Sequence, residues 1–239
     1  MDFTKAYLTI VKRSVERNTK ELPTILSCLD FEGLNCLEIG PGPLARLAVK
    51  ISGFANHITC LETNAQTVEA INKLIKEQGL EKRISVTHYE PPTSYKLPFQ
   101  DKKFDLVYGA WLPHKLVTNQ EFLDEISRVS SRHLLLILPG IKGDEPKLVS
   151  LIKPQEKERR LEYKQKISDY LRTKGYFLDY KEGMLKLDFA SSEEIRDTFY
   201  CLAFKNESTD KQKTKVNKFL DSRTHNFKDG FYCIHAENS

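Results

Sequence analysis

The chain has 239 residues, and because 40% of them are hydrophobic it can bury a sizeable core in one large domain. Its formal net charge of +4 is mild, so it permits an anionic partner without requiring one. No run approaches the ~18 apolar residues of a membrane-spanning helix, and the N-terminus lacks a charged-then-apolar signal pattern. We therefore expect a cytoplasmic protein without a membrane span.

The cysteines are scattered and lack the spacing of a metal site or a redox motif. Most lie in apolar segments, which predicts reduced and buried side chains. No group of His, Asp and Glu has the spacing of a metal site either, so we expect no bound metal. The cysteines are Cys28, Cys36, Cys60, Cys201 and Cys233.

Two helices are expected at the N-terminus, over residues 2–16 and 21–29. The first places Tyr7 and Ile10 on an apolar side and charged residues on the other, and the second tolerates Pro23 in its first turn.

Strands then alternate with helices, which predicts a mostly parallel sheet with helices on both faces. The predicted strands are 35–39, 57–61, 83–88, 104–108 and 133–138, the last closed by Pro139 and Gly140. The predicted helices are 44–51, 65–78 and 121–129.

The C-terminal half is richer in charge. A helix is expected over residues 155–174, either as a solvated face or as a basic rim for an acidic or nucleic-acid partner. A strand over 176–189 and a helix from Ser191 follow. The aromatic residues of this region either pack that helix or line a pocket; they are Phe189, Phe199, Tyr200 and Phe204. A polar, partly mobile stretch over 205–218 precedes a last strand over 230–235.

The stretch from Asn35 to Ala45 combines a buried strand, a glycine turn and the start of a helix. Such a turn presents backbone N–H groups and the positive end of a helix to a ligand. Gly40-Pro-Gly42-Pro-Leu-Ala45 satisfies G-x-G-x-x-G/A, which fits a dinucleotide or S-adenosylmethionine (SAM). Glu62, at the end of the second strand, is placed to take the ribose hydroxyls of either ligand.

Glu38 distinguishes between these two ligands. A carboxylate just before the first glycine repels the phosphates of a dinucleotide, whereas SAM carries an ammonium and a sulfonium and no phosphate. Glu38 therefore favours SAM over a nicotinamide cofactor.

Three motifs together resemble those of class I SAM-dependent methyltransferases: Leu37–Gly42, Leu61-Glu62 and Phe104–Tyr108. The resemblance covers about residues 35–140. It implies a Rossmann-like α/β fold with a seven-stranded, mostly parallel sheet. The last strand of that sheet, residues 231–234 here, would be antiparallel and inserted between strands five and six.

The resemblance also implies the contacts to the cofactor. Glu38 and Gly40 would hold the methionine end of SAM. Gly42 would let the backbone approach the nucleoside, and Glu62 would bind the ribose. The chain departs from the family at Leu44, where many members carry a third glycine.

Further contacts are implied after the third and fourth strands. Glu90 would contact the adenine amino group, although its neighbours Pro91 and Pro92 are unusual there. Tyr108 and Gly109 would lie beside the transferred methyl group.

Two residues after the fourth strand are candidates for the acceptor site. Trp111 is either part of the core or a wall of the substrate pocket. His114 is either a surface residue or a general base, a role that its ordinary pKa suits. Tyr108–Trp111 does not match the Asn/Asp-Pro-Pro-Tyr/Phe signature, which disfavours methylation of an exocyclic base amine or a glutamine amide.

We expect residues 1–239 to form one methyltransferase domain. It would comprise N-terminal helices (1–30), a SAM-binding core (35–140) and a substrate or lid half (141–239), with the N-terminal helices and residues 189–225 covering the site. The expected acceptor is an O or N atom of a small molecule, since no separate nucleic-acid module is present.

Three alternatives stay open: an NAD(P)-dependent oxidoreductase, an aminopropyltransferase and a non-catalytic SAM-binding protein. The acceptor and the oligomeric state are left open by the sequence.

Overall fold

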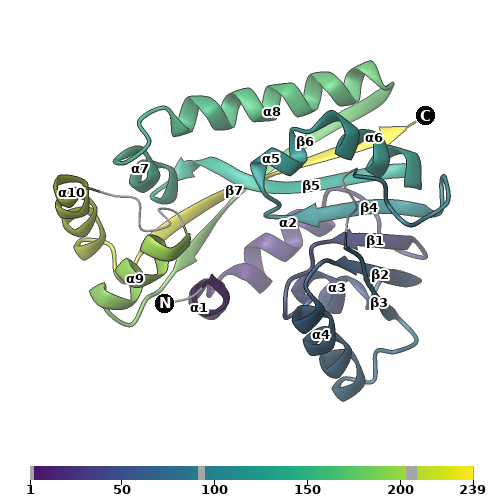
Figure 1. The fold of residues 1–239 in the computed structure, drawn as a ribbon, viewed down its shortest axis with the longest axis horizontal. Helices are drawn as coiled ribbons and strands as arrows, with labels where there is room; N and C mark the ends of the chain where they lie inside the picture. The colour runs from purple at the N-terminus through teal and green to yellow at the C-terminus, as the bar shows by residue number, and fades with distance from the viewer. Residues whose placement is uncertain (1–2, 91–94, 203–208, 239) are drawn as a thin grey trace. The chain divides into compact units, whose positions relative to one another are not determined.

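The computed structural model describes residues 3–90, 95–202 and 209–238. Within these ranges, seven strands form one sheet in the order β3-β2-β1-β4-β5-β7-β6 (Figure 1). The strands are β1 (Asn35–Ile39), β2 (His57–Glu62), β3 (Ile84–His88), β4 (Phe104–Ala110), β5 (Ser130–Gly143), β6 (Tyr176–Leu187) and β7 (Phe227–Asn238).

Strand β1 lies between β2 and β4 and runs parallel to both. Glu38 is in register with Cys60 on β2 and with Tyr108 on β4. Residues in register on neighbouring strands share one face of the sheet. The register therefore brings the side chains of Glu38 and Tyr108 to the same face.

Strand β7 runs antiparallel to its neighbours and is inserted between β5 and β6 (Figure 1). This confirms the predicted Rossmann-like fold and the place of its last strand. Strands β1 and β4 are neighbours near the centre of the sheet, and most of their residues are buried. Parallel strands covered on both faces have nearly continuous apolar sequences, as these two do.

The helices of the described ranges follow most of the predicted segments. They are α1 (Phe3–Arg13), the π-helix η1 (Arg17–Glu21), α2 (Leu22–Leu26), α3 (Arg46–Ile51), α4 (Ala65–Glu77), α5 (His114–Val117), α6 (Gln120–Val129), α7 (Glu145–Ser150), α8 (Glu156–Thr173), α9 (Ser192–Leu202) and α10 (Asp210–Asp221). Side-chain caps begin two of them: Asn64 accepts from the N–H of Thr67, and Asn119 from that of Phe122.

Two local predictions are wrong. The second N-terminal helix is split into η1 and α2. Strand β5 runs through Pro139 and Gly140 instead of ending there. Gly140 is needed for the approach of β7, because a Cβ on it would lie 2.7 Å from the backbone carbon of Gly230.

The stretch predicted as polar and partly mobile contains helix α10. Its start carries a capping box, in which Thr209 and Gln212 satisfy each other's backbone N–H groups. This cap explains how a lysine-rich sequence forms a helix here. Phe204 lies outside the described residues.

The chain divides into two compact units. The first comprises Met1–Thr24, Pro139–Glu162 and Glu182–Tyr232, and the second Ile25–Leu138, Tyr163–Lys181 and Cys233–Ser239. All residues predicted to contact the cofactor belong to the second unit, as do Trp111 and His114.

The core of the first unit contains the aromatic residues of the C-terminal half. Phe189 and Phe199 are buried, and the ring of Phe199 lies 4.6 Å from that of Phe227. These two side chains therefore pack helix α9. Tyr200 donates a hydrogen bond to the Asn217 side chain at 3.2 Å, which ties α9 to α10.

Of the five cysteines, all are free thiols, and Cys28, Cys36, Cys60 and Cys233 are buried as expected. Among the helices that the structure describes, none combines the length and the apolar character needed to cross a bilayer.

Candidate cofactor site

Glu38 and Tyr108 form a buried polar pair at the carboxyl ends of β1 and β4. The Tyr108 hydroxyl donates a hydrogen bond to Glu38 Oε2 over 3.1 Å. Glu38 is 2% exposed and Tyr108 1% exposed. The sequence predicted both residues as cofactor contacts but did not predict that they bind each other.

Burial raises the pKa of Glu38 to about 7. The Tyr108 hydroxyl, the charge of Arg46 and the backbone of Ala48 oppose this rise without cancelling it. Burial also raises the pKa of the Tyr108 phenol, so Tyr108 stays protonated and remains a donor. A cationic or hydrogen-bond-donating ligand would therefore stabilise the ionised form of Glu38.

The glycine turn after β1 uses backbone conformations that favour glycine. Gly40 has a φ of 64° and Gly42 a φ of 68°. The Gly40 N–H donates to the carbonyl of Leu61 at 3.0 Å, which joins the ends of β1 and β2. Ala45 is also left-handed, with a φ of 38°, immediately before α3. Non-glycine residues in this region store strain, and such strain clusters at ligand sites.

Leu112 lies against the turn. A Cβ on Gly40 would meet Leu112 Cδ2 at 3.1 Å, and a Cβ on Gly109 would meet Leu112 Cδ1 at 2.5 Å. Leu112 is 7% exposed. The sequence reasoning missed this residue, although an apolar side chain just beyond a strand at the predicted site was an available signal.

Glu62 is held by the backbone that follows it. Its Oε1 accepts hydrogen bonds from the N–H groups of Thr63 at 2.8 Å and Asn64 at 3.0 Å. Among the residues that the structure describes, these bonds reach Oε1 and none reaches Oε2. Glu62 is 9% exposed, so Oε2 is a positioned acceptor near the surface.

Glu90 is not part of this buried group. Its side chain is 84% exposed and its carboxylate lies 4.0 Å from His88 Nε2. Pro91 and Pro92 lie outside the described residues. The contact of Glu90 with adenine therefore stays a prediction.

Trp111 and His114 follow β4. The backbone of Trp111 is left-handed, with a φ of 59°. Its backbone N–H donates to the Ile137 carbonyl at 2.8 Å. It is half-buried, so it is not part of the fully buried core. His114 is also half-buried, and its ring stacks on that of Tyr163 with centroids 4.7 Å apart. The stacking orients the imidazole.

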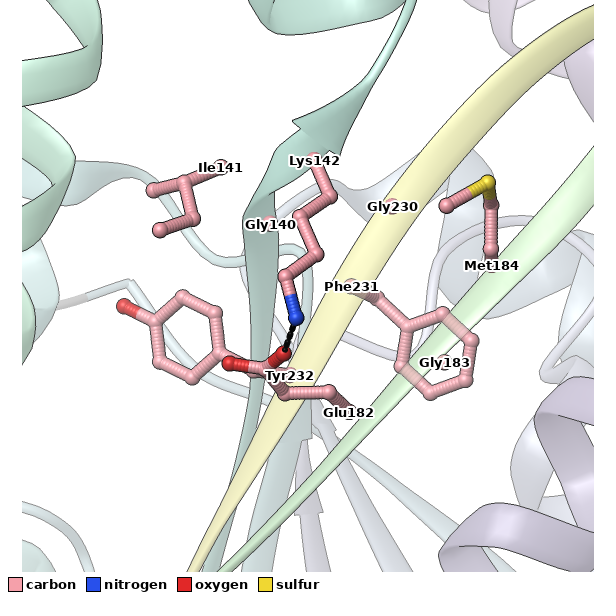
Figure 2. Close-up of a pocket in the computed structure, with 9 residues that line it drawn as sticks. All are labelled: Gly140, Ile141, Lys142, Glu182, Gly183, Met184, Gly230, Phe231 and Tyr232. Atoms are coloured by element: carbon pink, nitrogen blue, oxygen red, sulfur yellow. Dashed lines mark hydrogen bonds and ion pairs between the residues drawn. The ribbon is translucent and has the colours of Figure 1, made fainter.

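A hollow of about 230 Å³ lies within the first unit, between the ends of β5, β6 and β7. It is lined by residues 140–142, 182–184 and 230–232. Figure 2 shows Lys142 and Glu182 reaching toward each other across β7, and their Nζ and Oε2 atoms are 2.7 Å apart. None of the predicted cofactor residues lines this hollow.

The residues of the second unit fit SAM. Glu38 is a buried carboxyl that an ammonium would stabilise, Glu62 offers a fixed acceptor for hydroxyls, and Gly40 and Gly42 keep the turn free of side chains. In the described parts of the chain, no group of three or more His, Cys, Asp and Glu side chains is placed to hold a metal ion.

The comparisons with known proteins agree with this chemistry. Residues 37–137 match the family described as a methyltransferase domain. No curated protein matches the sequence.

Solved structures share the fold. A SAM-dependent methyltransferase from Aquifex aeolicus has a TM-score of 0.54 and 15% identity, with 98% of each chain covered. The YcgJ protein from Bacillus subtilis has a TM-score of 0.60 and 13% identity, covering 90% of this chain and 96% of that one. Geranyl diphosphate C-methyltransferase from Streptomyces coelicolor has a TM-score of 0.56 and 11% identity, covering 99% of this chain and 84% of that one.

Fold, motifs and family match therefore define a class I methyltransferase domain. The chain carries this SAM-dependent methyltransferase domain over residues 37–137.

Proposed function

We propose that the protein transfers the methyl group of SAM to an O or N atom of a small-molecule acceptor. The observation that supports the cofactor half most strongly is the buried Glu38–Tyr108 pair beside Gly40. A desolvated carboxylate is stabilised most by a nearby cation, and the methionine end of SAM carries an ammonium group.

SAM supplies an electrophilic methyl group on a good leaving group. The residues of this chain then have to bind the cofactor, align the acceptor and exclude water. In this proposal Glu38 and Gly40 hold the methionine end, Gly42 and Glu62 the nucleoside, and Glu90 the adenine. Tyr108 acts by orienting Glu38.

Gly109, Trp111 and His114 belong to the acceptor side of the proposed site. Gly109 leaves the exit of β4 free of a side chain. Trp111 is a half-buried surface next to it, and His114, oriented by Tyr163, is a general base for an acceptor that must lose a proton.

We further propose that residues 1–239 act as one methyltransferase domain, with the core at 35–140 and the substrate half at 141–239. A small acceptor is favoured over nucleic acid because much of the charge between residues 142 and 174 is already paired. Arg160 binds Glu145, Arg172 binds Asp169, and Lys174 binds Asp124.

The likeness to geranyl diphosphate C-methyltransferase, at 11% identity, concerns the fold. It does not indicate that this chain methylates a carbon atom or binds a diphosphate.

The test uses the demethylated product S-adenosylhomocysteine (SAH) and labelled SAM. We expect calorimetry to detect SAH binding and no NAD binding, and labelled methyl groups to appear in small molecules of a cell extract. Transfer to RNA or protein alone would contradict the small acceptor. SAH binding without any transfer would support a non-catalytic SAM-binding protein.

A further inference from the structure

Two thiols of the second unit lie in contact with each other. Cys28 follows α2 and is 8% exposed, whereas Cys233 lies on β7 and is fully buried. A hydrogen bond joins the two side chains. The proposed methyl transfer uses neither residue, so the contact points to a chemistry of the thiols themselves.

The surroundings of Cys28 favour its thiolate. The pKa of Cys28 lies below its ordinary value, mainly because the Cys233 thiol donates a hydrogen bond to its sulfur. Burial opposes this shift, the charge of Lys181 adds to it, and the charge of Asp179 opposes it. Lys181 and Asp179 lie on β6, the strand next to β7. Because the thiolate is the nucleophilic form of cysteine, Cys28 is prepared to react.

The buried thiols of β1 and β2 have the opposite character. Burial raises the pKa of Cys36 to about 12. Burial, together with the charges of Glu38 and Glu62, also raises the pKa of Cys60. Both thiols therefore stay protonated and unreactive, and of these three buried thiols Cys28 is the one whose ionisation is favoured.

Exposure gives the two members of the pair different roles. Cys28 retains some contact with solvent, so a small reagent can reach it, whereas Cys233 is shielded and touches Cys28 from inside the unit. A thiol of lowered pKa with a second thiol beside it is the arrangement of cysteines that respond to oxidants. In this arrangement the first thiol is attacked and the second one resolves the product.

We propose that Cys28 and Cys233 form a redox modification site, at which a hydroperoxide oxidises the pair to a disulfide. The Cys28 thiolate attacks the terminal oxygen of the hydroperoxide, so that an S–O bond forms and the O–O bond breaks. The leaving oxygen takes the proton that Cys28 released and departs as an alcohol or as water. Cys28 is thereby oxidised to a sulfenic acid and the peroxide is reduced.

Cys233 completes the reaction. Its sulfur attacks the sulfur of the Cys28 sulfenic acid, the S–S bond forms, and the hydroxyl group leaves with the Cys233 proton as water. Two thiols and one hydroperoxide thus give one disulfide, one water and one molecule of alcohol or water. The inference does not depend on the proposed function, because the reaction takes place at thiols that do not contact the proposed cofactor.

The test uses the full chain, which is reduced with dithiothreitol and separated from it before a small excess of hydrogen peroxide is added. Thiols are counted in denaturant at intervals, and disulfides are located by mass spectrometry of peptides prepared without reduction. The variants are Cys28→Ala and Cys233→Ala. Cys201→Ala is the matched control, because Cys201 is a half-buried thiol of the first unit.

We expect the wild type and Cys201→Ala to form a disulfide between Cys28 and Cys233, and dithiothreitol to restore both thiols. Cys28 should be oxidised at least about tenfold faster than Cys36 and Cys60, because the rate follows the thiolate fraction. In Cys233→Ala the Cys28 sulfenic acid should persist and be trapped by dimedone, with no disulfide within the chain.

The wild type decides the question by itself if a variant fails to fold. Peptides that show Cys28 and Cys233 still reduced after Cys201 is oxidised would overturn the inference, as would a disulfide that links Cys28 only to another copy of the chain. Oxidation of Cys233 at the wild-type rate in Cys28→Ala would also contradict it, because Cys28 would then not be the thiol that the peroxide attacks.

Discussion

The hydroxyl of Tyr108 donates a hydrogen bond to Oε2 of Glu38 over 3.1 Å, and both side chains are buried. Seventy positions separate the two residues in the chain, and the parallel register of β1 and β4 places them opposite each other. The Tyr108 hydroxyl is thereby a neutral donor to the carboxyl, while the burial of Glu38 favours a further, cationic donor.

Glu38→Gln should weaken SAH binding by about tenfold to a hundredfold, because an amide lacks the charge that attracts the ammonium. The fold should be kept, since the variant removes a desolvated charge. Calorimetry with SAH measures the effect. The control is Glu69→Gln on the exposed face of α4, which should bind SAH like the wild type. If both variants bound SAH with equal affinity, the methionine end of the ligand would not lie at Glu38.

Tyr108→Phe should destabilise the protein by about 1–2 kcal/mol, because it leaves a buried carboxyl oxygen without its donor. SAH binding should also weaken, since Glu38 is then no longer oriented. Urea unfolding and calorimetry measure the two effects. Tyr180→Phe removes the hydroxyl of a half-buried tyrosine that accepts a hydrogen bond from Arg172 at the surface, and it should change neither quantity. Unchanged stability in Tyr108→Phe would contradict the buried hydrogen bond.

The stability of the ligand-free protein should depend on pH through Glu38. Its pKa is raised from the ordinary 4.5 to about 7 in the fold, so the neutral form favours folding. This contribution is complete below the unfolded pKa and is lost as pH rises through the folded pKa. The total loss is about 3 kcal/mol.

The measurement is the free energy of unfolding between about pH 4 and about pH 8, for the wild type and for Glu38→Gln. The difference between the two isolates Glu38 from Asp229, whose pKa is raised in the same direction. The wild type should also gain SAH affinity relative to the variant over the same rise in pH, because the bound ammonium favours the carboxylate. Parallel pH curves for the two proteins would show that Glu38 does not titrate in this range.

Gly140→Ala should destabilise the protein by about 3 kcal/mol. The added Cβ would lie 2.7 Å from the backbone carbon and 2.9 Å from the carbonyl oxygen of Gly230, and backbone atoms of a paired strand cannot easily move away. Thermal unfolding measures the loss. In Gly53→Ala the nearest atom, the Lys50 carbonyl oxygen, is 3.8 Å away, so stability should change by less than about 0.5 kcal/mol. Similar stabilities of the two variants would mean that β5 and β7 do not approach closely at Gly140.

Features with a local cause could be predicted from the sequence. The glycine turn, the periodicity of α4 and α6, and the strands β1 to β4 depend on neighbours a few positions away. Glu62 was recognised because it ends an apolar strand, and Glu38 because it lies two residues before the first glycine of the turn. The family motifs occur in that same stretch, and the match over residues 37–137 agrees with them.

Features with a distant cause could not be predicted. Strand β5 continues past Gly140 because β7, some ninety residues later in the chain, pairs with it. Leu112 is part of the candidate site because its side chain meets Gly40 and Gly109 in space. Asp229 carries no special signal in the sequence, and its carboxyl is desolvated only because remote segments of the chain pack around it.

Local patterning was thus enough to identify the fold class and the cofactor, because hydrogen-bonded strands, helices and turns are specified by residues close together in the chain. The contact of Tyr108 with Glu38, the pKa values of Glu38 and Asp229, and the close approach of β5 and β7 depend on register and desolvation. Both arise only when remote segments pack, since burial is a property of the assembled fold and not of any one segment.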